Sequence, residues 1–425
     1  MTRTFTLTCV ALATVLAGCE VRSKLFCDMH LDDPRCAGAG DSGVDGSAIG
    51  CTTPAQCVGH PATPACDVPD GVCVPCIDNA TCSGATPTCN LDDHTCRACK
   101  VHADCASDVC LDSGMCADAA QVAYVSPAGD DAAACTQAAT CKTAAIALGK
   151  ALPFVRLSGE TTSTRLVIDR PVTFVADPGT TTLSGSEAAT FEVATGGDLT
   201  VEDLKLTSTS SSGVGVSLPA NSTGTATITR CTLTGNDGGA ITASKGTLSV
   251  TRSTIIDNTG GGIVMGGAMG VTFTIVNNFI VRNGNSSTAS AGGALLVPKP
   301  NASNTFAFNT VVDNLAKNGA GTSGGVLCDA TLTLDNNLVA RNFVNNSPTV
   351  ANANFFGLCM HGNSATDTTV TAFHFKSPDN DPFDYHLEDG SVAIDAGSGS
   401  AVTVDFDGEP RPNGTAPDLG ADEKY

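Results

Sequence analysis

Apolar and polar residues alternate in short runs along the second half of the chain, and five of these runs align over nine positions. The runs are ITRCTLTGN (228–236), VTRSTIIDN (250–258), IVNNFIVRN (275–283), FAFNTVVDN (306–314) and LDNNLVARN (334–342). Their first and sixth positions are always apolar, and their ninth is always Asn. We predict that these two apolar columns point inward and stack from one run to the next.

The spacing of the runs indicates a repeat with insertions. Their final Asn residues are 22, 25, 31 and 28 positions apart, and a fainter copy, VEDLKLTST (201–209), precedes them. Fixed strand chemistry with variable spacing is expected of a solenoid whose loops emerge on one side. The fourth position suits an internal ladder of side chains at a bend, and it holds Cys231, Ser253, Asn278, Asn309 and Asn337.

This repeat resembles that of the parallel β-helix in pectate lyases and many bacterial surface proteins. The resemblance covers roughly residues 120–345 and implies an all-β, right-handed parallel β-helix. Residues 123–152, AYVSPAGDDAAACTQAATCKTAAIALGKAL, resemble the beginning of such bacterial domains: a strand, a loop closed by Cys135 and Cys141, and a helix over 143–152. An uncovered solenoid end exposes apolar side chains and unpaired backbone, so we expect this segment to form a cap.

The chain ends in another recognisable segment, YHLEDGSVAIDAGSGSAVTVDFDGEPRPNGTAPDLGADE (385–423). Its motifs S-x-A-I-D-A-G, D-x-D-G-x-P-R-P and D-x-G-A-x-E resemble the C-terminal segment of many secreted bacterial β-helix proteins. We therefore expect residues 346–425 to close the far end of the solenoid. A bond between Cys328 and Cys359 would tie the last rung to this segment, and it would leave Cys231 free and facing inward.

The chain has 21 Cys residues, and twelve of them form three groups of four that each open with C-x5-C. The groups are Cys51, Cys57, Cys66, Cys73; Cys76, Cys82, Cys89, Cys96; and Cys99, Cys105, Cys110, Cys116. Two C-x-x-C pairs at 73–76 and 96–99 have the spacing of a four-thiolate zinc site, but that site would leave the matching cysteines unexplained. Two disulfides per group explain all twelve, so residues 51–116 are predicted to form three disulfide-stapled modules. The sequence does not determine which cysteines pair within each module.

The first twenty residues, MTRTFTLTCVALATVLAGCE, have a positive Arg3 and then an apolar stretch, a pattern typical of an export signal. The run LAGC (16–19) resembles the lipobox of bacterial lipoproteins, in which the bond before the Cys is cut and the Cys carries a lipid. The resemblance implies removal of residues 1–18, a lipid on Cys19, and a location at the cell envelope, at the outer membrane or cell surface. The membrane would then be a partner through the lipid alone.

Residues 19–50 link this anchor to the stapled modules. They contain a small loop that a bond between Cys27 and Cys36 would close. The loop is followed by AGAGDSGVDGSAIG, a Gly/Ser/Asp-rich run that is predicted to be a flexible tether. The three modules behind it resemble the short Cys-rich repeats of surface lipoproteins from some soil bacteria. Export would place all of these cysteines where disulfides persist.

Charge and aromatic content narrow the class of partner. The chain has 22 Lys and Arg against 43 Asp and Glu, a formal net charge of −21. Because a binder of phosphates needs a cationic face, nucleic acid and anionic headgroups are disfavoured as partners. There is no Trp, and the only tyrosines are Tyr124, Tyr385 and Tyr425. The rungs therefore lack the rings on which sugar-cleaving clefts stack their substrate.

The eighth position of the runs holds the candidate catalytic residues, and it reads Gly235, Asp257, Arg282, Asp313 and Arg341. Asp257 and Asp313 would lie two rungs apart with Arg282 between them, about 9–10 Å by strand spacing. A glycosidase pair needs about 5–9.5 Å, so the fit is marginal. The alternating sign favours a charge ladder between stacked rungs, with Asp257, Asp313 and Arg282 retained as catalytic candidates.

The third position offers another candidate surface, Arg230 and Arg252 followed by Asn277. Two arginines could supply a base or bind an acidic polysaccharide, but solvated side chains are the simpler interpretation. No His falls between positions 103 and 360, so the rungs offer no imidazole base and no His-ligated metal.

The C-terminal segment contains candidate calcium ligands, the only cofactor that the sequence suggests: Asp405, Asp407, Asp418 and Asp422, with Glu423 beside them. Calcium prefers carboxylate and carbonyl oxygens, which these residues would supply. The alternative is a turn-rich cap in which the same side chains accept hydrogen bonds from backbone N–H groups.

These patterns predict a lipid-anchored surface protein with a tether, a Cys-rich stalk and a β-helix. Its expected role is non-catalytic, in adhesion, in binding of a polysaccharide or surface protein, or in envelope structure. The alternative is a polysaccharide lyase or glycoside hydrolase that acts on one face of the β-helix, although fold by itself is an analogy. A spacer without a ligand is a third interpretation.

Overall fold

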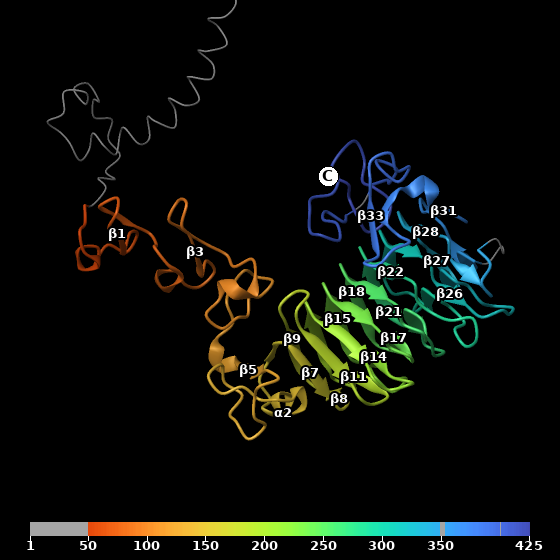
Figure 1. Ribbon diagram of the computed structural model, residues 1–425, viewed down its shortest axis with the longest axis horizontal. Coiled ribbons are helices and arrows are strands. Elements are labelled where there is room, and N and C mark those ends of the chain that lie inside the picture. The colour runs from red at the N-terminus through yellow and green to blue at the C-terminus, as the bar shows by residue number, and fades with distance from the viewer. Residues whose placement is uncertain (1–49, 349–352, 400) are drawn as a thin grey trace, which may run out of the picture. The chain divides into compact units, whose positions relative to one another are not determined.

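The computed structural model of the chain describes residues 50–348, 353–399 and 401–425 (Figure 1). These residues form two compact units, and the boundary between the units along the chain lies between Cys116 and Ala117. The boundary falls where the last Cys-rich module was expected to end.

Three predictions for the N-terminal segment lie outside the described residues. They are the export signal over 1–18, the lipid on Cys19, and the disulfide between Cys27 and Cys36 in the tether. Neither Cys27 nor Cys36 is a described residue, so their bond stays a prediction from the sequence, unlike the other predicted bonds.

The first unit is held together by disulfides. Each module joins its first Cys to its third and its second to its fourth, as Cys51–Cys66, Cys57–Cys73, Cys76–Cys89, Cys82–Cys96, Cys99–Cys110 and Cys105–Cys116. Since all twelve thiols are bonded in pairs, none is left as a thiolate for zinc. The modules contain the antiparallel pairs β1 (Ala65–Asp67) with β2 (Val72–Val74) and β3 (Thr88–Asn90) with β4 (Thr95–Arg97), and the 3-10 turns η2 (Pro54–Gln56), η3 (Asn79–Thr81) and η4 (His102–Asp104).

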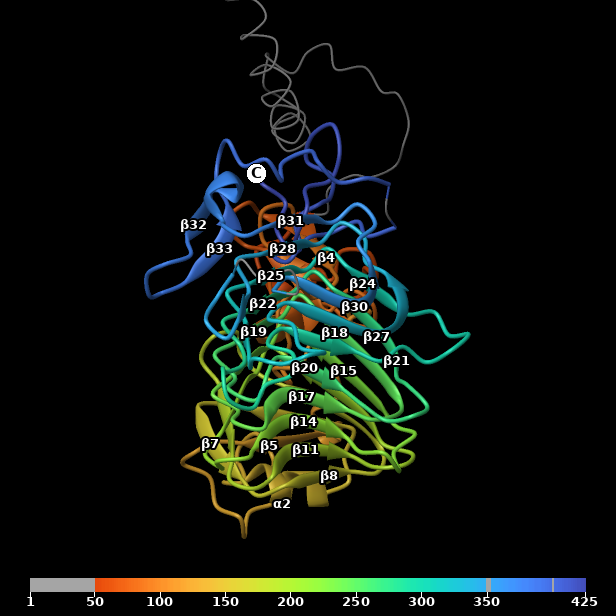
Figure 2. The same ribbon diagram turned by 90° about the vertical axis from the view of Figure 1, so that its right-hand side faces the viewer.

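The second unit is a parallel β-helix of three sheets, which the chain visits in turn, so that most strands pair in parallel with the strand three elements later (Figure 2). The first sheet contains β5 (Val122–Val125), β6 (Phe154–Leu157), β9 (Pro171–Val175), β12 (Asp198–Glu202), β15 (Thr225–Thr229), β18 (Thr247–Thr251), β21 (Thr272–Val276) and β24 (Thr305–Ala307). The all-β, parallel β-helix class expected from the repeat is confirmed.

The second and third sheets complete each rung. The second sheet contains β7 (Glu160–Ser163), β10 (Thr182–Gly185), β13 (Lys205–Ser208), β16 (Thr232–Thr234), β19 (Thr254–Ile256), β22 (Phe279–Val281), β25 (Thr310–Val312), β28 (Leu338–Ala340) and β31 (Ala365–Asp367). The third contains β8 (Leu166–Ile168), β11 (Ala189–Val193), β14 (Val214–Leu218), β17 (Gly239–Ala243), β20 (Ile263–Met265), β23 (Ala294–Leu296), β27 (Val326–Thr333) and β30 (Phe355–Met360). A side pair joins β26 (Leu315–Ala316) to β29 (Phe343–Val344). Strands β30 and β31 extend the solenoid beyond residue 345, where it was expected to end.

The predicted columns stack as expected. The first-position residues Ile228, Val250, Ile275 and Phe306 are partners in neighbouring strands of the first sheet. The sixth-position residues Leu233, Ile255, Ile280, Val311 and Val339 do the same in the second sheet. All of them are buried in one continuous core. The β-branched and aromatic side chains of these columns suit the pleated, half-buried surface of a strand.

The beginning of the solenoid is covered as predicted. Strand β5 and the helix α2 (Ala144–Gly149) follow the turn η5 (Ala119–Gln121), and the bond Cys135–Cys141 closes the loop between them. Ala144 and Ala147 on the helix join the main core. The helix is shorter than the predicted span of 143–152, because the chain turns at Ala151, which has a φ of 58°.

Two internal ladders of asparagine flank the second sheet. In the first, Asn278 donates through Nδ2 to Asn309 at 3.0 Å, and Asn309 donates to Asn337 at 3.0 Å. Ser253 and Cys231 continue this ladder toward the N-terminus, because the Ser253 Oγ accepts the backbone N–H of Cys231 at 3.1 Å. The fourth-position column is therefore the internal ladder that the sequence predicts.

The second ladder consists of the Asn residues that end each run. Its amides bond in sequence, at 2.8–3.0 Å, from Asn236 to Asn258, Asn283, Asn314, Asn342 and Asn354. Each interior amide also donates to a carbonyl of the preceding rung, as Asn283 does to Ile255 at 2.8 Å. The close approach needs glycine opposite: a Cβ at Gly293 would lie 2.7 Å from the Gly325 carbonyl oxygen.

The C-terminal segment packs on the flank of the solenoid. Its turn η6 (Thr371–Phe373) and the antiparallel hairpin β32 (Phe375–Ser377) and β33 (Asp384–Leu387) lie against outward-facing side chains of the second sheet. This second core contains Phe279, Val281, Val312, Leu338 and Ala340 from the sheet, and Val370, Phe373, Phe375, Tyr385, Leu387, Ala393, Leu419 and Ala421 from the segment. Covering this sheet face is a role that the sequence did not predict, and closure of the far end stays a prediction. The bond Cys328–Cys359 joins neighbouring strands β27 and β30.

We predict that Asn283→Ala lowers the free energy of unfolding of the β-helix by about 3 kcal/mol. The change removes the acceptor of the buried Asn258 backbone N–H, one of the acceptors of the Asn258 amide, and the side-chain donor to the Ile255 carbonyl. Urea denaturation followed by circular dichroism measures the effect. Asn318→Ala is the matched control, because Asn318 is exposed, and its stability should change by less than about 0.5 kcal/mol. Equal effects of the two variants would contradict a stabilising ladder.

Candidate functional site

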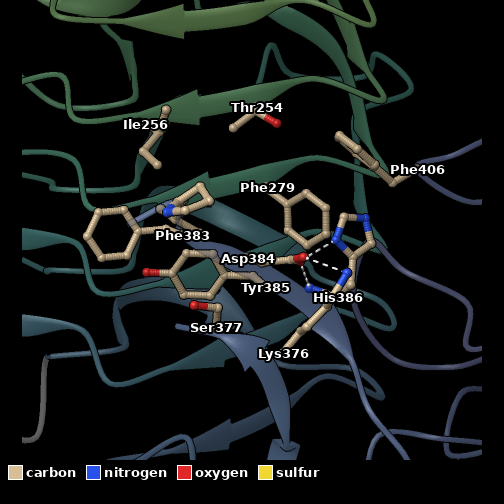
Figure 3. A pocket seen from close by; sticks show the side chains of 12 residues that line it. Thr254, Ile256, Phe279, Lys376, Ser377, Phe383, Asp384, Tyr385, His386 and Phe406 are labelled. Carbon is tan, nitrogen blue, oxygen red and sulfur yellow. Dashed lines mark hydrogen bonds and ion pairs between the residues drawn. The ribbon is translucent and has the colours of Figure 1, made fainter. Parts of the chain in front are cut away.

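A groove of about 490 Å³ lies between the second sheet and the C-terminal hairpin (Figure 3). Its wall on the sheet side is formed by outward-facing residues of β19 and β22, and the opposite wall by β32, β33 and the turn between them. Its lining is Thr254, Ile256, Phe279, Val281, Lys376, Ser377, Pro382, Phe383, Asp384, Tyr385, His386 and Phe406. The groove exists because β-strand alternation turns Thr254, Ile256, Phe279 and Val281 away from the core.

Five of the twelve residues that line the groove carry aromatic rings. The Phe279 ring centroid lies 4.6 Å from that of Phe406 and 4.9 Å from that of His386. The Arg282 guanidinium lies 3.7 Å above the Phe383 ring, a cation–π contact at the end of the hairpin. Tyr385 is buried and Phe383 is half-buried. The site therefore offers flat apolar faces in a solenoid whose rungs were expected to offer none.

Three charged residues, Asp384, His386 and Lys376, line the groove beside these rings. The Asp384 carboxylate accepts hydrogen bonds from His386 Nδ1 at 2.5 Å and from the His386 backbone N–H at 3.0 Å, and Lys376 Nζ lies 3.2 Å away. On the other side of the imidazole, Nε2 lies 3.2 Å from Asp407 Oδ2. Both ring nitrogens of His386 are thus held by carboxylates.

These contacts set the protonation of the group. Burial lowers the pKa of His386, but the hydrogen bonds with Asp407 and Asp384 outweigh it and bring the pKa to about 9. The hydrogen bond from His386 lowers the pKa of Asp407. Burial raises the pKa of Asp422 to about 6. His386 is therefore an imidazolium at neutral pH, with neither nitrogen available as a general base.

The predicted charge ladder is present in the eighth-position column. Arg282 Nε lies 2.9 Å from Asp257 Oδ1, and Arg341 Nε lies 2.5 Å from Asp313 Oδ1. Asp313 also accepts a hydrogen bond from the Tyr385 hydroxyl at 2.7 Å. The side chain of Asp313 is 11% exposed, whereas that of Asp257 is 45% exposed. Asp313 thus anchors the hairpin to the solenoid, while Asp257 stays open to solvent.

The third-position column also contacts the C-terminal segment. Arg252 Nε donates to the Phe406 carbonyl at 2.9 Å, and Asn277 Nδ2 donates to the Val404 carbonyl at 2.7 Å. Arg230 forms ion pairs with Asp203 and Glu202 at 2.8 and 3.1 Å. The interpretation of both arginines as simply solvated is therefore wrong, because Arg230 pairs with carboxylates of the preceding rung and Arg252 contacts the C-terminal segment.

The candidate calcium ligands fall into two groups. Asp405 accepts backbone N–H bonds from Gly408, Glu409 and Glu423, and Asp418 accepts them from Asp395 and Lys424. Asp407 and Asp422 instead lie beside His386, and one ligand atom from each of these three residues lies within 4.8 Å of the others. Among the described residues, no such group of three includes Asp405 or Asp418.

The sequence reasoning missed the hairpin residues at the centre of the site. Phe383, Tyr385 and His386 fall within FDYH (383–386), which places three rings in four residues of a chain with 4% aromatic residues. That density was a signal in the sequence. Their position over β19 and β22 was not, because it depends on how the hairpin docks on the solenoid.

No family model matches this chain, and no curated protein is detectably similar to it. Among solved structures, that of the pectate lyase Pel9A is similar over 72% of this chain and 96% of that chain, with 16% sequence identity and a TM-score of 0.38. At this identity the similarity bears on the fold alone. Within the described residues, no helix is both long enough and apolar enough to cross a membrane.

We predict that Asp313→Ala loosens the C-terminal hairpin, with a loss of about 2–4 kcal/mol in unfolding free energy. The variant leaves Tyr385 without its hydrogen-bond acceptor and removes the buried partner of Arg341. Asp257→Ala, in the same column but exposed, should cost less than about 1 kcal/mol. Amide hydrogen exchange over residues 375–387 measures the loosening. Unchanged protection in Asp313→Ala would contradict the anchoring role.

Proposed function

We propose that this protein is a binding protein that holds a saccharide chain in the groove between β22 and the C-terminal hairpin, without cleaving it. The observation that carries the proposal is a groove of about 490 Å³ in which aromatic rings and a few polar groups converge. Ligand sites are typically concave and apolar, with a small number of polar groups that fix orientation. The half-buried ring of Phe383 would stack on a sugar, while Lys376, Ser377 and Thr254 offer hydrogen-bonding groups.

The state of the charged residues favours binding over catalysis. His386 is held at both nitrogens, and Asp384 accepts hydrogen bonds from His386 while pairing with Lys376. Asp313 is occupied by Arg341 and Tyr385. A general base needs a free lone pair within reach of the substrate, which His386 lacks, and the hydrogen bonds to Asp384 and Asp313 occupy part of the lone pairs of those carboxylates. Asp257 is the exception, since its carboxylate is exposed beside Arg282.

The exposed carboxylate of Asp257 allows a catalytic function to be tested as the alternative. A polysaccharide lyase or glycoside hydrolase would use this carboxylate and Arg282 at the edge of the groove. The shared fold adds little weight, because one fold hosts many functions. Cleavage that disappears in Asp257→Asn would replace the binding proposal with this one.

A lipid on Cys19 would display the groove at the cell envelope of a bacterium, with the stapled modules between the membrane and the β-helix. Acidic saccharides, neutral saccharides and surface proteins are the ligand classes to be compared. The arrangement is proposed from the lipobox resemblance and the disulfide-bonded modules.

The groove is tested with the full chain, purified in detergent, against neutral and acidic polysaccharides with and without calcium. Phe383→Ala should weaken binding of the retained polysaccharide about tenfold, because it removes one stacking face. Phe356→Ala is the matched control, since Phe356 is an exposed ring on β30, which does not line the groove. Depletion of polysaccharide from solution measures binding, and new reducing or unsaturated ends measure cleavage. Binding that both variants weaken equally, or no binding at all, would reject the groove.

The anchor has its own prediction. In a bacterial host, Cys19→Ser should move the chain from the membrane fraction to the soluble fraction, because no acyl chain can then be attached. Cys9→Ser lies in the segment expected to be removed, and it should leave the distribution unchanged. Retention of Cys19→Ser in the membrane fraction would contradict lipidation at this residue.

A further inference from the structure

Three side chains from distant points of the C-terminal segment converge beside the groove, and one of them, His386, also lines it. His386 lies on β33, Asp407 directly follows Phe406, and Asp422 lies 15 residues beyond Asp407. One ligand atom from each lies within 4.8 Å of the other two, and His386 Nε2 is 3.2 Å from Asp407 Oδ2. Imidazole nitrogen with two carboxylates is a donor set suited to zinc and similar dications.

We propose that His386, Asp407 and Asp422 bind a transition-metal dication of the zinc class, a site that goes beyond saccharide binding in the groove. Ligand atoms about 2.0–2.2 Å from a tetrahedral ion are about 3.4 Å apart. The separation of Nε2 and Oδ2 already matches this, so these two ligands need almost no movement. Asp422 closes the third position by a shift of about 1 Å within the observed cluster.

The other ring nitrogen of His386, Nδ1, already donates a hydrogen bond to a carboxylate, as the far nitrogen of a metal-bound His usually does. Asp384 Oδ1 accepts from His386 Nδ1 at 2.5 Å, and Lys376 in turn holds the other oxygen of that carboxylate at 3.2 Å. In metal sites, a carboxylate on the far nitrogen fixes the tautomer and aims the near nitrogen at the ion. Asp384 would be such a positioning residue. Coordination would replace the hydrogen bond between Nε2 and Asp407 and release the proton that they share.

Asp422 combines burial with access to a cavity. Only 6% of the residue is exposed, and within the described chain a hydrogen bond reaches only its Oδ2, from the Leu387 backbone N–H at 2.6 Å. Asp422 and His386 both line a second cavity, of about 380 Å³. A single hydrogen bond leaves most of the lone pairs of a carboxylate free, so Asp422 can still bind a cation from this cavity.

The second cavity surrounds the proposed ion with more carboxylates than cations and leaves space for a fourth ligand. It is lined by Glu388, Glu409, Asp422 and Glu423, against the cations Lys376, His386 and Lys424. Excess carboxylate favours a dication, and three protein ligands leave a fourth position for water or for an oxygen of a ligand. The ion would also tie β33 to the last residues of the chain.

The donor set separates this site from calcium. Calcium takes six to eight oxygen ligands, and imidazole is not among those it prefers. The carboxylates that would complete an oxygen cage, Asp405 and Asp418, already accept two or more backbone N–H bonds each. We therefore expect zinc to bind more tightly than calcium.

The test titrates the full chain, first stripped with EDTA, with ZnCl2 and separately with CaCl2 by isothermal calorimetry. We expect one zinc ion per chain and a rise in melting temperature. His386→Gln should weaken zinc binding at least tenfold, and Asp384→Asn by about tenfold as a positioning residue. The matched control is His361→Gln, an exposed His whose ring stacks on Phe355, and its zinc affinity should be unchanged.

Other outcomes would overturn the site. Zinc binding that His386→Gln and His361→Gln affect equally would mean adventitious binding at surface histidines. Tighter binding of calcium than zinc would mean an oxygen-only site elsewhere. If His386→Gln fails to fold by circular dichroism, Asp407→Asn replaces it, because Asp407 is half-exposed and lies in a turn. Saccharide binding is measured on the same stripped protein, so loss of the metal site and loss of the groove are distinguishable.

Discussion

The two asparagine ladders are the constraint on which the rest of this solenoid depends. An amide placed inside an apolar core costs several kcal/mol unless each donor and acceptor is satisfied. Here each interior Asn depends on the rungs before and after it, as Asn283 does on Asn314, Asn258 and Ile255. A rung shifted by one residue would leave these groups without partners and turn its apolar columns outward. The ladders thus fix the register of every rung from Asn236 to Asn354.

The ladders also determine what lies outside the solenoid. At each bend the residue before a ladder position takes a left-handed backbone, with φ of 52° at Arg252 and 55° at Asp257. That geometry points successive side chains outward from the same corner, so charges of alternating sign stack as Asp257 with Arg282 and Asp313 with Arg341. The neighbouring corner then offers donors to the C-terminal segment through Arg252 and Asn277. The bends that bury the ladder amides therefore also form the surface on which the C-terminal segment packs.

Docking of the C-terminal segment forms the two cavities described above. The bare second sheet would present Phe279 and its neighbours to water as a flat face. The hairpin places Phe383, Tyr385 and His386 opposite that face and creates two cavities that share Lys376 and His386. Its own turns are secured by carboxylates such as Asp405, which accepts backbone N–H bonds, and by the fully buried pair of Arg411 and Glu423. The proposed groove and the proposed metal site both depend on this docking.

The sequence by itself determined the repeat, because a strand period of two and a recurring Asn are local patterns that survive any loop length. It likewise determined the stapled modules and the internal small or polar column at Ser253 and Asn278. Connectivity within the modules came only from the structure, since spacing allows several pairings. The roles of Asp313, Tyr385 and His386 also came only from the structure. These residues lie up to 73 positions apart in the sequence, and their contacts exist because one segment packs on a distant sheet face. Long-range docking of that kind leaves no periodic signal in the chain.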